Sequence, residues 1–102
     1  MTTIFKANKA FVLLKDLLSI LESQHEKNWS RGLKSAIAEL LDSKGNVIAS
    51  GFDNERSIYN TMTAGGGGLS EYFVGMDDED KRLQLNEKLD MLRRQIWAVF
   101  ND

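Results

Sequence analysis

The closing stretch of the chain, residues 77–102, constrains the fold more than any other segment. It reads DDEDKRLQLNEKLDMLRRQIWAVFND. Its apolar residues recur every three or four positions, a spacing that places them in one stripe along a helix. The stripe consists of Leu85, Leu89, Leu92, Ile96, Val99 and Phe100. Such a helix has to bury one side, so the rest of the chain must supply the surface on which it packs.

The polar residues of this stretch complete the pattern of a surface helix. Asp77 and Asp78 occupy the expected N-cap position, and the two acids that follow favour the positive end of the helix dipole. The opposite face carries Lys81, Arg82, Glu87, Lys88 and Arg94. We therefore predict a solvated polar face and a buried stripe.

Composition indicates one folded domain over residues 1–102, because 102 residues cannot build two cores. The chain has no proline and no cysteine, which suits helices and excludes disulfides and thiolate chemistry. A net charge of −2 disfavours nucleic acid as a direct ligand. The most apolar stretch, residues 10–21, contains Lys15 and Asp16, so we predict no membrane span and a cytoplasmic protein.

Two amphipathic segments precede the middle of the chain. The first runs from Asn8, the expected N-cap, to Ser23, and Val12, Leu13 and Ile20 broaden its apolar face. The second covers residues 28–43, with Gly45 as the expected C-cap glycine. A short polar link joins them, which predicts an antiparallel helical hairpin. Their main apolar positions are Phe11, Leu14, Leu17, Leu18 and Leu21 in the first, and Trp29, Leu33, Ile37, Leu40 and Leu41 in the second.

The middle of the chain is less regular. Val47–Gly51 could begin a strand, but no partner strand is evident, so we interpret it as a connector that caps the core. A third helix is predicted from Asp53 or Asn54 to Met62. Four glycines, Gly65–Gly68, then interrupt the chain, and residues 69–74 form either a helical turn or an extended piece. The predicted fold is all-α: one compact domain of about four main helices, with the C-terminal helix packed on the N-terminal hairpin.

No catalytic or metal-binding pattern emerges. The glycine run lacks the spacing of both phosphate-binding fingerprints, which favours a tight turn with at least one positive φ. His25 is the only histidine and has no nucleophile beside it. The acidic run 77–80 lacks the alternating pattern of a calcium loop. We predict no enzyme activity, no cofactor and no metal, and we place Trp29 and Trp97 in the core.

Several residues resemble those of a family of small bacterial all-helical domains of unknown function. The shared features are Trp29 at a helix start, a glycine-rich turn before a serine (residues 65–70), and a closing N-x-x-L-x-x-L-R…I-W helix. In this chain the closing positions are Asn86, Leu89, Leu92, Arg93, Ile96 and Trp97. Asn86 and Arg93 are seven residues apart and lie on nearly the same side of the helix. We expect their side chains to bond the backbone of the glycine turn.

The size, acidity and lack of a catalytic set also resemble immunity proteins, which neutralise the toxin of a toxin–immunity pair such as contact-dependent growth inhibition. That resemblance implies a bacterial, cytoplasmic protein that binds a basic nuclease toxin and blocks its active site. Carboxylates would stand where the nucleic acid phosphates bind. The expected binding residues are acids around two possible aromatic anchors: Glu71, Tyr72, Phe73, Asp77, Asp78, Glu79 and Asp80.

Two other functions stay open. One is a small ligand-binding or enzymatic domain that uses Gly65–Gly68 with Asn86, Arg93 and Glu71. The other is a structural or oligomerising helical module. The sequence does not distinguish a binding role of the glycine turn from a structural one.

Overall fold

The structure, a computed structural model, describes residues 3–63, 72 and 74–101. These residues contain four α-helices and one short 3₁₀ turn. In chain order they are α1 (Thr3–Ser23), α2 (Asn28–Glu39), the 3₁₀ turn η1 (Ala49–Gly51), α3 (Phe52–Thr63) and α4 (Glu79–Asn101). No strand occurs among these residues. The all-α prediction is confirmed. The run Gly65–Gly68 and residues 69–71 lie outside the described residues.

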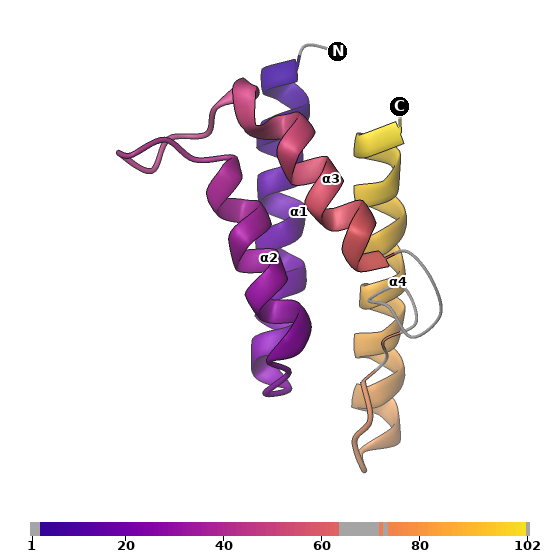
Figure 1. Cartoon of the computed structure of the whole chain (residues 1–102). Coiled ribbons are helices and arrows are strands. Elements are labelled where there is room, and N and C mark those ends of the chain that lie inside the picture. Colours follow the sequence, from indigo (N-terminus) through magenta and orange to yellow (C-terminus); the bar gives the residue numbers. More distant parts are fainter. Residues whose placement is uncertain (1–2, 64–71, 73, 102) are drawn as a thin grey trace.

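The helices surround one core. α2 folds back along α1 as the predicted hairpin, α4 runs antiparallel to α1 on its other side, and α3 crosses the front (Figure 1). The C-terminal helix therefore packs on the α1 half of the hairpin, while α3 packs on α2. The stripe of α4 enters the core as predicted, with Leu89, Leu92, Ile96, Val99 and Phe100 buried and Leu85 partly buried.

α1 starts earlier than the sequence pattern suggests. It begins at Thr3, so Asn8 lies inside the helix and is not its N-cap. The Asn8 side chain is exposed and its amide donates a hydrogen bond to the Ile4 carbonyl at 3.0 Å. The reason is burial: Ala7 has no exposed surface, and packing therefore holds the turn that precedes Asn8. The expected role of Val12 is also wrong, because this side chain is 58% exposed.

The end of α1 explains the position of the single histidine. His25 adopts a left-handed φ of 57° and is exposed. The Glu26 amide donates to the Leu21 carbonyl at 3.0 Å and the His25 amide to the Glu22 carbonyl at 3.1 Å, the bonds of a Schellman cap. The Glu26 carboxylate then accepts from the amides of Trp29 and Ser30, which begins α2. His25 thus turns the chain, as its place in a polar link predicts.

α2 ends at Glu39, four residues before the predicted end, because Asp42 organises a turn. The Asp42 carboxylate accepts from the amides of Lys44 and Asn46 at 2.8 and 2.9 Å. These bonds lower the pKa of Asp42, Asn46 contributing most. Gly45, at φ 84°, therefore closes this turn and is not the C-cap of α2. The turn projects from the body of the molecule (Figure 1).

The connector after this turn behaves largely as expected. Val47 pairs with Leu41 in an isolated antiparallel bridge, and both side chains pack against the core. η1 follows, and a Cβ at Gly51 would collide with the carbonyl of Glu39, so this crossing requires glycine. α3 begins at once with the buried Phe52, which places Asp53 and Asn54 inside its first turn and contradicts their predicted role as N-caps.

Aromatic packing joins α3 to the end of α4. The ring of Phe100 lies 5.6 Å from that of Phe52 and 5.5 Å from that of Tyr59, centroid to centroid, in tilted arrangements. The Arg56 guanidinium also donates to the Phe100 carbonyl at 3.4 Å, near the negative end of the α4 dipole. α3 is therefore held against the C-terminal half of α4. No helix among the described residues has both the length and the apolar character needed to cross a membrane.

Candidate functional site

One side of α4 holds the segment that precedes it. The Asn86 side chain accepts from the Val74 amide at 2.6 Å and donates to the Val74 carbonyl at 3.0 Å. The Arg93 guanidinium donates to the Tyr72 carbonyl at 2.7 Å, and that of Arg82 donates to the Met76 carbonyl at 3.4 Å. Residues four and seven apart share one side of a helix. These three side chains, the inner row of α4, therefore reach every second residue of the segment 72–76.

The inner row satisfies backbone groups that lack access to water. Val74 is 1% exposed, so its amide and carbonyl would each carry a desolvation cost without Asn86. The sequence predicts that Asn86 and Arg93 bond the backbone of the glycine turn, and this stays a prediction. Their partners in the structure are Val74 and Tyr72. The predicted partners, Gly65–Gly68, lie outside the described residues.

Away from the core, α4 exposes large apolar side chains, and we call this surface its outer face. Leu83 is 52% exposed, Met91 51% and Trp97 65%. The core prediction for Trp97 is therefore wrong, whereas Trp29 is partly buried against the core as predicted. The reason is helical geometry: Trp97 follows the buried Ile96 by about 100° of rotation, which carries its side chain beyond the edge of the stripe. In Figure 1 no other helix lies beside the N-terminal half of α4 on the side away from α1.

Charges on the outer face are mainly acidic. Glu79, Asp80, Glu87 and Asp90 are exposed there, and Arg94 stands among them. The carboxylate of Asp90 pairs with the guanidinium of Arg93 at 2.8 Å. Among the described residues, neither Glu79, Asp80, Glu87 nor Arg94 forms an ion pair. Carboxylates therefore dominate the N-terminal half of the face, interleaved with Leu83 and Met91.

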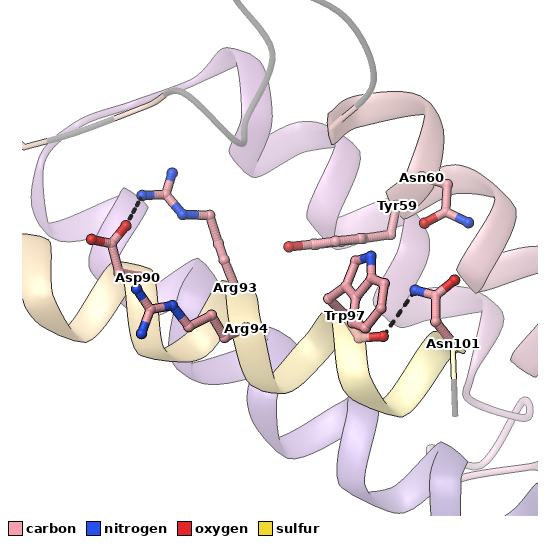
Figure 2. A pocket seen from close by; sticks show the side chains of 7 residues that line it. All are labelled: Tyr59, Asn60, Asp90, Arg93, Arg94, Trp97 and Asn101. Carbon is pink, nitrogen blue, oxygen red and sulfur yellow. Dashed lines mark hydrogen bonds and ion pairs between the residues drawn. The ribbon is translucent and has the colours of Figure 1, made fainter.

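A cleft adjoins the C-terminal half of this face. It has a volume of about 680 Å³ and lies where α3 faces α4. In Figure 2 two of its side chains come from α3 and the others from α4; the lining residues are Tyr59, Asn60, Asp90, Arg93, Arg94, Trp97 and Asn101. The Asn101 side-chain amide donates to the Trp97 carbonyl at 2.9 Å, which ties the end of the helix together beside the indole. Trp, Tyr and Arg are the residue types most enriched at energetically important interface positions.

The predicted binding residues differ in their exposure to solvent. Asp77, Asp78, Glu79 and Asp80 are exposed at the start of α4, and Asp78 accepts from the Lys81 amide at 3.1 Å as the predicted N-cap. Tyr72 packs against the core, and burial, with the Glu26 charge as a lesser cause, raises its pKa. It is therefore not a fully exposed anchor. Glu71 and Phe73 lie outside the described residues.

Sequence reasoning missed the outer-face residues Leu83, Met91 and Trp97 as candidates. A signal was present, because Leu83 and Met91 are apolar residues that do not fit the three-and-four spacing of the stripe. A large apolar residue off the stripe of an amphipathic helix has no place in the core. Such residues mark a surface patch.

Within the described part of the chain, no group of three or more histidine or acidic side chains could hold a metal ion. Comparison with models of protein families, with curated proteins and with solved structures gives no match. The resemblances drawn from sequence motifs therefore stay predictions.

Proposed function

We propose that this chain is a protein-binding module that docks a basic partner on the outer face of α4. The observation that supports it is the exposure of Leu83, Met91 and Trp97 on a helix whose other side fills the core. Large apolar side chains exposed within a polar surround are typical of interaction surfaces. A helix anchored this firmly in the core also presents them with little entropy left to lose.

The charge of the face favours a basic partner. Glu79, Asp80 and Glu87 surround Leu83 and are exposed without ion pairs among the described residues. Such carboxylates accelerate association with a cationic surface and oppose an acidic one. A nuclease toxin is the sharpest form of this proposal, because its active site has to attract phosphates and a row of carboxylates can occupy it.

The test is co-expression with a toxin domain encoded beside this gene, read out as survival of the host. Asp80→Lys combined with Glu87→Lys should abolish protection, since both reversals fall on the docking face. Asp16→Lys, an exposed reversal on α1, is the matched control and should leave protection intact. Asp78 is a poorer site for this experiment because it also caps α4. Protection that survives both reversals, or the lack of any neighbouring toxin gene, would contradict the toxin form of the proposal.

A second variant separates the apolar contribution from the electrostatic one. Trp97→Ala should leave the association rate and its salt dependence nearly unchanged but speed dissociation, as loss of an interface anchor does. Biosensor kinetics with the purified partner measure both rates. If Trp97→Ala binds like the unaltered chain, the docking surface is limited to the acidic end of α4.

The ligand-binding alternative finds less support. It requires Asn86 and Arg93 to face a ligand, yet Asn86 directs both polar atoms at Val74 and Arg93 binds Tyr72 and Asp90. These bonds give both side chains a structural role.

A further inference from the structure

The outer face of α4 has an internal symmetry. Leu83 and Trp97 each lie seven residues from Asp90, one on either side. Glu87 and Arg94, of opposite charge, lie at equal distances from the point between Asp90 and Met91. We propose that this face pairs with the same face of a second copy of the chain, the two α4 helices running antiparallel about that point.

A two-fold interface must be self-complementary, because each contact occurs twice with the roles exchanged. Antiparallel pairing about this point satisfies the requirement. Glu87 of each copy stands opposite Arg94 of the other, which forms two equivalent ion pairs. About this point Leu83 of each copy falls one residue, about 1.5 Å along the helix axis, from the level of Trp97 of the other, so the two side chains can still meet. The charged pair and the apolar pair therefore agree on the register to within one residue.

The surface at the centre of this register is hollowed. A depression of about 360 Å³ is lined by Glu87, Asp90, Met91, Arg94 and Gln95. Four of these follow the i, i+3, i+4, i+7 pattern that forms a hole for an inserted side chain when helices pack. Asp90 and Met91 of the second copy are the side chains at that level, and the flexible thioether of Met91 adapts well to an irregular hollow.

Like charges at the centre do not oppose the pairing. Each Asp90 carboxylate is held by the Arg93 of its own chain at 2.8 Å, which offsets its charge. Asp77 and Asp78 lie beyond Leu83, towards the end of the paired stretch. Because one helix per copy carries the contact, the interface is small, and we expect a dimer that forms in the micromolar range.

This inference rests on the face used in the proposed function and adds a regulatory consequence. The dimer covers Leu83, Glu87 and Met91, so a bound partner and a second copy exclude one another. The paired form is then the state of the chain without its partner, and it keeps the apolar face from water. Partner binding proceeds from the monomer.

The experiment is sedimentation equilibrium of the purified full chain and of two charge reversals. Glu87→Arg and Arg94→Glu each place like charges at both ion pairs and should weaken self-association by about tenfold or more. An equimolar mixture of the two variants restores opposite charges at both pairs. It should therefore form a heterodimer at least as tight as the unaltered dimer. Lys88→Glu, an exposed reversal beside the face, is the control and should change little.

The mixing result is specific to this register. Glu87 and Arg94 are two helical turns apart within one chain, so no intramolecular ion pair explains rescue. A chain that stays monomeric at every concentration, or reversals that leave association unchanged, would overturn the proposal. A mixture that stays monomeric would do so too. These measurements use the chain alone, so their failure leaves partner docking intact, and loss of host protection leaves the dimer intact.

Discussion

Two adjacent arginines of α4, Arg93 and Arg94, lie in different environments. The side chain of Arg93 is 15% exposed, and it binds the Tyr72 carbonyl and the Asp90 carboxylate. Arg94 is exposed, and none of the described residues forms an ion pair with it. One step of about 100° around the helix separates a side chain that holds the fold from one that is available to a partner.

The same contrast extends along the whole helix. The inner row meets backbone groups of residues 72–76 and is hydrogen-bonded at each position. The outer face carries apolar side chains next to carboxylates, a combination that is unfavourable in isolation and useful in recognition. α4 therefore has two roles: its buried stripe and inner row stabilise the fold, and its outer face exposes apolar and charged side chains. Substitutions at neighbouring residues can test each role separately.

A large effect is expected where the helix enters the core. Leu92 is 3% exposed, and Leu92→Ala should lower the free energy of unfolding by about 2–5 kcal/mol through lost burial and a cavity. Its neighbour Met91 is 51% exposed, so Met91→Ala should change stability much less. Arg94→Ala should fall within about 0.5 kcal/mol of the unaltered chain. Urea unfolding of dilute, monomeric protein measures all three, and equal effects would mean that the stripe is assigned to the wrong face.

A loss of similar size is expected from the inner row. Asn86→Ala leaves the buried amide and carbonyl of Val74 without partners and should cost about 2–6 kcal/mol, since each of the two unsatisfied groups costs about 1–3 kcal/mol. Glu87→Ala, the adjacent exposed position, is the control and should stay within about 0.5 kcal/mol. Hydrogen exchange gives a local readout, because the Val74 amide should lose its protection only in the first variant. Unchanged exchange would show that the segment is held by other contacts.

Much of this arrangement can be predicted from the sequence, because periodicity reports burial. The stripe of α4 and the α1–α2 hairpin follow from spacing alone. Helix ends are harder, because they depend on contacts distant in sequence. Ala7 extends α1 before Asn8 through its burial, and the carboxylate of Asp42 ends α2 before Gly45 by binding the amides of the next turn.

The proposed binding surface is predictable only in part. Local charge identifies Asp77–Asp80, and local spacing could have identified Leu83 and Met91. The cleft depends on how α3 crosses α4. The packing of Phe52 and Tyr59 on Phe100 sets that crossing, and the pattern of a single segment does not reveal it. Trp97 lies at the edge of the apolar stripe, which predicts a place in the core, but at such an edge a rotation of one residue decides between core and surface.

The smallest expected effect is a titration on the inner side of the helix. Burial, and to a lesser degree the charge of Glu26, raises the pKa of Tyr72 above 10.0, because both disfavour the phenolate. The unfolded chain therefore loses this proton first as pH rises. Below pH 10.0 both states keep the proton and Tyr72 adds no pH dependence; above it, stability falls until the folded pKa is passed.

Tyr72→Phe should remove that slope. The chain has two tyrosines, so the absorbance titration of the unaltered chain minus that of the variant gives Tyr72 directly. A Tyr72 titration midpoint at or below pH 10.0 would mean that Tyr72 is not buried in solution, and hence that the segment held by Asn86 and Arg93 opens. The inner row of α4 would then not hold that segment in place.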